Sequence, residues 1–260
     1  MYDEPYEHTR EERDGLTIRI VADSDSFNPR TDYDHFGKMI CFHSRYTLGD
    51  EHDFKEPQDF FLSLIDEERF DRFKNWNWLQ YHAMVPSKLT LDQALTKADA
   101  AESDWIHARI EESALLLPLF LYDHSGITMS TGAFSCPWDS GQVGWIYATH
   151  DDIRREYSRK RLSKKTLDRA RTLLEGEVEE YDNYLTGNVW GFIVEDEDGD
   201  NLDSCWGFNG EPEYCLSEAR RSAAWHAKDI AKTRAEEQEA AAIAAARAME
   251  AARPDMYGSA

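Results

Sequence analysis

The sequence predicts an α+β fold: a mostly antiparallel sheet with helices packed on one side, plus a long C-terminal helix rich in alanine. Three observations predict this fold. Short apolar or alternating runs lie between turn residues, as expected of strands. Longer segments repeat apolar residues every three or four positions, which is typical of amphipathic helices. The segment from Leu216 to Ala252 consists mainly of Ala, Glu and Arg, which favour helix.

The predicted strands are short and each is bounded by turn residues. In chain order they are Leu16–Val21, Met39–His43, Leu115–Tyr122, Ile127–Met129, Gln142–Ala148, Val189–Glu195 and Asn201–Phe208. Pro118 interrupts the third strand, so we expect an edge strand or a bulge there. The last two strands flank Asp198-Gly199 and are predicted to form a β-hairpin around that turn.

The predicted helices begin at capping residues or follow an apolar stripe. The first is Phe54–Trp78. The second is capped by Thr90 and runs to about residue 100, with 104–114 continuing it. The others are 150–158, which Thr149 caps, 163–185, and the tail from Leu216. We therefore expect three parts: residues 1–15 as a mobile charged leader, 16–210 as the α+β domain, and 211–260 as a C-terminal helical tail.

The overall charge limits the classes of partner. The formal net charge is −22 over 260 residues, which disfavours direct binding to nucleic acid or to an anionic membrane. No run of residues has the apolar length of a membrane span, and the N-terminus lacks the pattern of a signal peptide. Four cysteines stand without CxxC spacing, as in reduced cytosolic proteins. We expect a cytoplasmic protein.

One stretch of the chain contains acidic side chains but no basic ones. Between Thr172 and Ala219 there is no Lys or Arg, while fourteen carboxylates occur there. A surface of one sign repels itself, and most proteins intersperse the two signs. The stretch therefore indicates either a solvated acidic surface or a binding face for a basic partner.

In the helix predicted over 163–185, the charged side chains lie at the ends where the helix dipole disfavours them. Four cations (Lys164, Lys165, Arg169, Arg171) lie in its N-terminal half and five carboxylates lie in its C-terminal half, and each such placement costs a few tenths of a kcal/mol. Its apolar stripe, predicted to pack on the sheet, comprises Leu167, Ala170, Leu174, Val178, Tyr181 and Leu185. Gly176 could bend or end the helix.

The acidic residues of this helix and of the following hairpin are the candidate partner-binding site. They are Glu175, Glu177, Glu179, Glu180, Asp182, Glu195, Asp196, Glu197, Asp198 and Asp200. Carboxylates along a rigid element can replace phosphates in a nucleic-acid-binding cleft, as in DNA-mimicking inhibitors. The hypothesis is that they bind a basic surface of a host protein or protein complex as one continuous ridge.

Motifs for catalysis and metal binding are weak. Asp123 and His124, with Asp139, contain residue types that suit metal-assisted hydrolysis, and this is one alternative function; the same residues also suit turns. Cys41 and His43 share one strand face but lack a second ligand pair. We predict no catalytic residue, metal site or cofactor. A second alternative is an oligomeric structural or assembly protein that pairs through the alanine-rich tail.

Several motifs together resemble a widespread family of uncharacterised acidic proteins encoded by bacteriophages, plasmids and other mobile elements. The segments that carry the resemblance are Asn28–Arg30, Met39–Asp50, Leu119–Thr128, Trp138–Gly144, Leu174–Asp182, Tyr184–Gly187 and Cys205–Phe208. The likeness covers about residues 16–210. It implies an accessory protein in the cytosol of a host bacterium, whose expected role is inhibition of a host DNA-processing or anti-phage defence complex.

Overall fold

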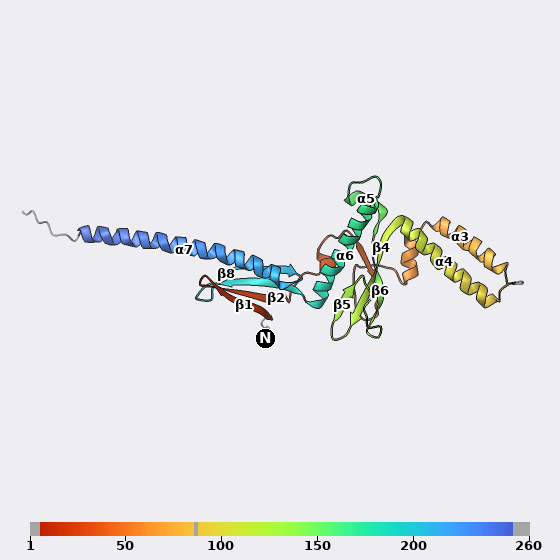
Figure 1. Cartoon of the computed structure of the whole chain (residues 1–260), viewed down its shortest axis with the longest axis horizontal. Coiled ribbons are helices and arrows are strands. Elements are labelled where there is room, and N and C mark those ends of the chain that lie inside the picture. The colour runs from red at the N-terminus through yellow and green to blue at the C-terminus, as the bar shows by residue number, and fades with distance from the viewer. Residues whose placement is uncertain (1–5, 86–87, 252–260) are drawn as a thin grey trace, which may run out of the picture. The chain divides into compact units, whose positions relative to one another are not determined.

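The computed structural model describes residues 6–85 and 88–251, which form two compact units. Of the described residues, the first unit comprises 6–26 and 187–251, and the second comprises 27–85 and 88–186. Each unit contains one four-stranded antiparallel sheet. The α+β class, the antiparallel pairing and the long C-terminal helix that the sequence predicts are confirmed (Figure 1).

The first unit is a sheet covered on one face by a helix. Its strands, in the order β1-β2-β7-β8, are β1 (Glu7–Arg13), β2 (Leu16–Ala22), β7 (Val189–Glu195) and β8 (Asn201–Asn209). Helix α7 (Pro212–Ala251) packs its first turns on this sheet, where Cys215, Ala219 and Ala223 are buried. The predicted hairpin is confirmed, and Gly199 in its turn has φ +85°, a conformation that glycine adopts without strain.

Three parts of the expected domain division are wrong. The single α+β domain expected over 16–210 is divided between the two units, since 16–26 and 187–210 belong to the first and 27–186 to the second. Glu7–Arg13 is a strand paired with β2, whereas a mobile leader was expected over residues 1–15. The tail expected from residue 211 starts as a core element of the first unit, because the buried side chains of α7 belong to the same cluster as Ile18 and Val194. Residues 1–5 and 252–260, the remainder of the leader and tail assignments, lie outside the described residues.

The second unit has helices on both faces of its sheet. Its strands, in the order β3-β6-β4-β5, are β3 (Lys38–Cys41), β6 (Ser140–Thr149), β4 (Ala114–Asp123) and β5 (Ile127–Ser130). Its helices are α1 (Pro29–Asp32), α2 (Pro57–Ser63), α3 (Glu67–His82), α4 (Leu91–Ser113), α5 (His150–Glu156) and α6 (Lys164–Thr186).

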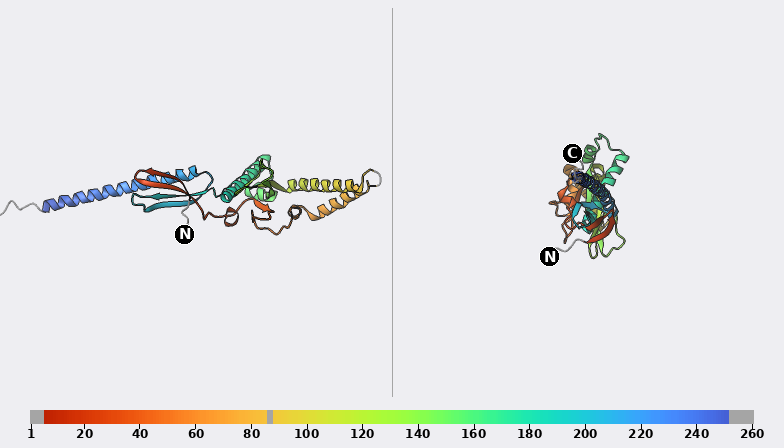
Figure 2. Two further views of the ribbon diagram at one scale, coloured as in Figure 1. Left: turned by 90° about the horizontal axis from the view of Figure 1, so that it is seen from below. Right: turned by 90° about the vertical axis from the view of Figure 1, so that its left-hand side faces the viewer.

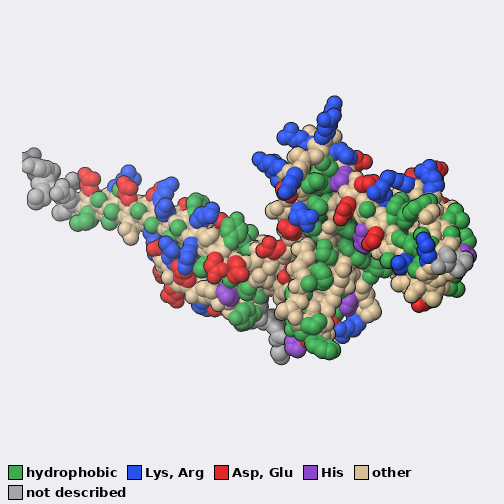
Figure 3. Space-filling view, turned by 45° about the vertical axis from the view of Figure 1, so that its right-hand side comes forward, with side chains coloured by type: hydrophobic (Ala, Val, Ile, Leu, Met, Phe, Trp, Pro, Cys, Tyr) green, Lys and Arg blue, Asp and Glu red, His purple; other side chains and the backbone are tan. Residues whose placement is uncertain are grey.

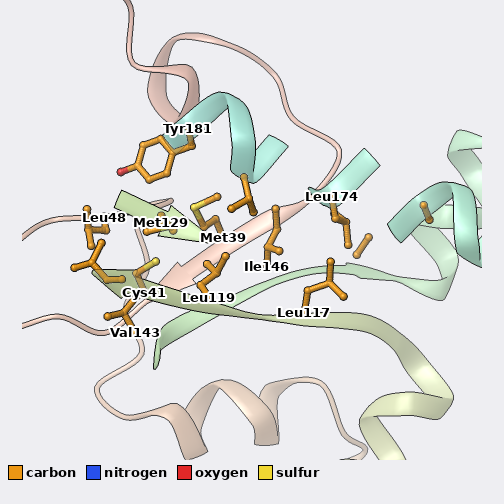
Figure 4. Packing of buried hydrophobic residues seen from close by; sticks show 14 of the residues in the cluster. Met39, Cys41, Leu48, Leu117, Leu119, Met129, Val143, Ile146, Leu174 and Tyr181 are labelled. Carbon is orange, nitrogen blue, oxygen red and sulfur yellow. The ribbon is translucent and has the colours of Figure 1, made fainter. Parts of the chain in front are cut away.

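One face of this sheet packs on α6. Leu174 and Tyr181 of α6 meet Met39, Ile146 and Leu119 of the sheet (Figure 4). The stripe predicted from the sequence is confirmed: four of its members are buried, and the two at its ends are partly buried against the same cluster. Burying a side chain of this size contributes about 1.5–3 kcal/mol.

The opposite face packs on α2 and α4. Phe60, Ile106 and Ile110 meet Ile40 and Tyr147, which alternate along their strands with the residues that face α6. The expectation that helices cover one side is therefore correct for the first unit and wrong for the second. Both strand faces are apolar here, because the sheet is buried between two layers.

Helices α3 and α4 form an antiparallel pair (Figures 1 and 2). The rings of Phe73 and Trp105 stack at 4.7 Å, and Asn77 Nδ2 donates to Ala98 O at 2.8 Å. The predicted cap of α4 is confirmed, since Thr90 accepts from the backbone of Gln93, whose side chain accepts from Thr90 N. The single helix expected over Phe54–Trp78 is instead two helices, α2 and α3.

The edge or bulge that Pro118 predicted in β4 is confirmed locally, because β4 has a neighbour on both sides only beyond Pro118. Strand β5 pairs only with Phe120–Asp123 of β4, so Pro118 lies where β4 pairs on one side alone. A register irregularity follows directly, between Leu119 and Phe120. A proline needs no ladder partner for its nitrogen at such a position. In the described part of the chain, no helix combines the length and apolar character needed to cross a bilayer.

Candidate functional site

The acidic residues of α6 divide into exposed and buried groups. Glu175 and Glu179 are exposed and one helical turn apart, and they form no ion pair within the described residues. Glu177 lies on the opposite side of the helix and is buried. The difference follows from the helical repeat, because Glu177 is directly beside the apolar stripe that packs on the sheet.

Glu177 belongs to a buried ionic network centred on Arg30. The guanidinium of Arg30, with its side chain 1% exposed, donates from Nη1 to Glu177 Oε2 at 3.2 Å. It also donates from Nε and Nη2 to the two carboxylate oxygens of Asp50, at 2.7 and 2.8 Å, and from Nη2 to Gly37 O at 2.8 Å. The backbone N–H of Phe36 donates to Glu177 Oε1 at 2.8 Å.

This network fixes two loops and removes Glu177 from the binding site. Asp50 also accepts from Met39 N at 2.9 Å, so that the loops on both sides of β3 are tied to α6. Tyr181 accepts from Gly49 N at 3.1 Å through its hydroxyl. Burial raises the pKa of Tyr181 and, with Asp50 nearby, raises the pKa of the neighbouring Cys41 thiol to about 12. Glu177 is therefore a structural residue.

Asp182 and Glu180 also interact within the chain. Asp182 Oδ1 accepts from Thr128 Oγ1 at 2.7 Å and from Met129 N at 2.6 Å, which attaches edge strand β5 to α6. Glu180 is partly buried and has a partner within the chain. Of the five α6 candidates, Glu175 and Glu179 remain available to a partner. We call these two residues the α6 acidic patch.

The hairpin between β7 and β8 shows the same division. Glu195 accepts from Arg19 Nη1 at 3.1 Å, and Asp196 Oδ1 accepts from the N–H groups of Asp198 and Asp200, both at 2.9 Å, which closes the turn. The side chains of the other three residues are exposed and form no ion pair within the described chain. We call Glu197, Asp198 and Asp200 the hairpin acidic patch.

The two acidic patches belong to different units. The α6 acidic patch lies in the second unit and the hairpin acidic patch lies in the first. The sequence hypothesis of one ridge that contains all ten residues is corrected, because half of these residues are bound within the chain, and the exposed ones form one group on each unit. Five of the ten predicted residues form the two patches, and Glu177, Glu180, Asp182, Glu195 and Asp196 have partners inside the chain.

The residues of the hydrolase alternative gather at one end of the second unit's sheet. Asp123 and Asp139 line a cleft of about 580 Å³, and Asp123 N donates to Asp139 O at 2.8 Å. His124 Nδ1 lies 3.5 Å from Asp139 Oδ2. Asp123 itself pairs with Arg45 and accepts from Tyr46 Oη at 3.3 Å. The turn after β4 and the turn before β6 are thus close, because the end of β4 pairs with the start of β6.

This arrangement does not assemble a metal site. Among the residues that the structure describes, no three His, Cys, Asp or Glu side chains are placed to hold one ion. Both carboxylates have partners: Asp123 is held by Arg45, and Asp139 accepts from Cys136 Sγ at 3.6 Å beside His124. Ser140 donates from its hydroxyl to Cys136 O at 2.5 Å, so it stabilises the turn. The geometry supports the structural interpretation of these residues.

Sequence reasoning missed Arg30 and Arg45. Each pairs with a carboxylate far away in the chain, at a separation of 147 residues for Arg30–Glu177 and 78 for Arg45–Asp123. No local pattern encodes such a pair. The motif Asn28-Pro29-Arg30 was a partial signal, because Asn28 caps α1 and so fixes the direction in which Arg30 leaves the backbone.

Fold and sites together define an α+β protein of two antiparallel-sheet units that presents exposed acidic patches. No protein-family model, curated protein or solved structure matches this chain.

Proposed function

We propose that this protein is a non-catalytic accessory protein that binds a basic surface of another protein through its two acidic patches. One observation supports the proposal most: five carboxylates are exposed and lack an ion pair within the described chain, in a stretch without any Lys or Arg. Self-repulsion among such groups is relieved when a cationic surface neutralises them.

The partner class that fits is a protein with a cleft for nucleic acid. Such clefts present clusters of Lys and Arg, and carboxylates can take the places of phosphates in them. The resemblance to mobile-element proteins suggests that the partner belongs to a host DNA-processing or anti-phage defence complex. Binding would then inhibit that complex by competition with DNA.

A capture experiment tests this proposal. The wild-type protein is immobilised and exposed to nuclease-treated bacterial lysate at two ionic strengths, where the Debye length changes from about 8 Å to about 3 Å. We expect capture of basic DNA-binding proteins at low salt only, and release of the captured proteins by added duplex DNA.

Charge-reversed variants assign the binding to the patches. Glu175→Lys with Glu179→Lys changes one patch, and Glu197→Lys, Asp198→Lys and Asp200→Lys together change the other. The control, Glu237→Lys with Glu239→Lys, places the reversed charges on the exposed end of α7. We expect both patch variants to lose capture and the control to keep it. Unchanged capture by both patch variants contradicts the proposal. Captured proteins that added duplex DNA does not release contradict it as well.

A further inference from the structure

A strongly basic surface lies at the start of α6, in a protein that is acidic overall. Residues 154–171 contain nine Lys or Arg and two Asp or Glu. Arg154 and Arg155 pair with Asp151 and Asp152. The other seven cations are exposed and have no ion pair in the described part of the chain. We call these seven the basic patch: Arg159, Lys160, Arg161, Lys164, Lys165, Arg169 and Arg171.

The basic patch covers one continuous part of the second unit. It extends from the end of α5 through the connecting loop and over the first two turns of α6. Lys and Arg side chains gather on this part of the molecule, with few Asp or Glu among them (Figure 3). Lys164 and Arg171 are separated by about 10 Å along the helix, at about 1.5 Å per residue. The patch is therefore larger than a site for one small anion.

Local stability does not account for these cations. Lys164 and Lys165 occupy the first turn of α6, which contains no acidic residue, and the helix dipole disfavours cations there. Ser163 accepts from Thr166 N at 3.2 Å and so caps the helix. The N–H groups of Lys164 and Lys165 precede the first hydrogen-bonded turn and point toward the same solvent region. Cations and free amide donors together favour an anionic ligand.

We propose that the basic patch binds the phosphate backbone of a nucleic acid without sequence preference. A duplex carries a charge about every 1.7 Å of its axis, so one polymer can neutralise all seven cations. Five of the seven are Arg or lie beside Arg in the sequence, and the planar guanidinium binds phosphate through two hydrogen bonds.

The net charge of −22 does not prevent this binding. Charges more than a Debye length of about 8 Å away are largely screened at physiological ionic strength. The acidic residues nearest to the seven cations in the chain are Glu156, Asp168 and Glu175, which form no ion pair within the described residues, so the cations are in excess. The expectation that the protein avoids nucleic acid came from the average charge, whereas the surface potential is set by the nearby groups.

A pocket beside the basic patch fits the same ligand. Arg171 lines a pocket of about 370 Å³ together with His107, His150 and Trp145, and Glu111 is its one carboxylate. Aromatic side chains next to a cationic groove stack with bases. A nucleic acid held on the patch can thus place a base or sugar against this pocket.

Fluorescence anisotropy with labelled duplex DNA, duplex RNA and single-stranded DNA tests the proposal on the full chain. If about six phosphates are contacted, affinity falls about 10³-fold between about 50 mM and about 200 mM salt. Lys164→Gln with Lys165→Gln is expected to lower the salt-dependence slope by about two. This variant also removes charges that the helix dipole disfavours, so it keeps its fold.

The matched control is Lys228→Gln with Arg234→Gln, which makes the same change of net charge on the exposed side of α7. We expect the control to bind as the wild type does. An equal loss in both variants, or absence of binding to all three probes at about 50 mM salt, overturns the proposal. Displacement of the probe by polyglutamate as efficiently as by unlabelled DNA also overturns it, because the patch would then bind acidic protein. The hairpin acidic-patch variant above is expected to leave this binding unchanged, whereas Glu175→Lys adds a cation one turn from Arg171 and is not used as a control here. The hairpin variant thus lets the two proposals fail separately.

Discussion

Arg30 shows how a single residue decides the roles of two carboxylates. Its guanidinium is almost completely buried and holds Asp50 and Glu177 by charge-assisted hydrogen bonds. Removing one member of a buried ionic network leaves an uncompensated charge in a medium of low dielectric constant. The network is thus sensitive to truncation at any of its three members, although its net contribution is small.

Replacement of Glu177 distinguishes a structural residue from a binding residue. Glu177→Ala is expected to lower the free energy of unfolding by about 3–5 kcal/mol, because it leaves the buried Arg30 with one of its two carboxylate partners. Glu175→Ala, two residues away on the exposed face, is expected to change it by less than about 0.5 kcal/mol. Urea denaturation measures both values. A similar, small effect of the two substitutions would contradict the buried network.

At the scale of elements, α6 is stable because packing outweighs unfavourable charge placement. The dipole conflict along α6 costs about 1–2 kcal/mol in total, at a few tenths for each exposed charge. Burial of Leu174, Val178 and Tyr181 contributes about 1.5–3 kcal/mol for each side chain. The helix therefore continues through Gly176, where the sequence left a bend open.

The substitution Gly176→Ala tests whether α6 is a regular helix at this position. A Cβ atom added at Gly176 has no neighbouring atom within 4 Å, and the residue is exposed within the helix. Gly176→Ala is expected to raise the free energy of unfolding by about 0.5–1 kcal/mol, because alanine loses less backbone entropy in a helix. Thermal denaturation followed by circular dichroism measures the change, with Glu175→Ala as the neighbouring control. Destabilisation by Gly176→Ala would indicate a bent helix.

At the scale of the whole molecule, α7 has two parts with different roles. Cys215, Ala219 and Ala223 are buried against the sheet of the first unit, and burial raises the pKa of the Cys215 thiol to about 12. Residues 231–250 are exposed on all sides (Figure 1). This exposed part carries the alanine-rich seam, so self-association through the tail stays a prediction.

Two truncations separate folding from association. A chain ended after residue 231 is expected to keep its secondary structure and cooperative unfolding, because residues 232–250 are exposed. A chain ended after Leu216 is expected to lose the first unit, because Ala219 and Ala223 leave its core. Circular dichroism and light scattering compare the two chains with the full protein. Loss of cooperative unfolding after the shorter deletion would show that the exposed part supports the fold.

The sequence alone determined most elements of this protein and the direction in which they face. The α6 stripe, the caps at Thr90 and Thr149 and the hairpin at Asp198-Gly199 all follow from periodicity and turn chemistry within a few residues. These signals are local, so they can be identified without the fold. The prediction of a single helix over 54–78 was wrong, because a short interruption between α2 and α3 leaves the apolar spacing nearly unchanged.

Only the tertiary structure decided which carboxylates are available to a partner. Glu175 and Glu177 are alike in the sequence, yet one is exposed and the other is bound to Arg30 from a distant loop. Glu195 is likewise paired with Arg19 on the neighbouring strand. The physical reason is that charge neutralisation depends on distance in space, which strand pairing and helix packing set between residues far apart in the chain.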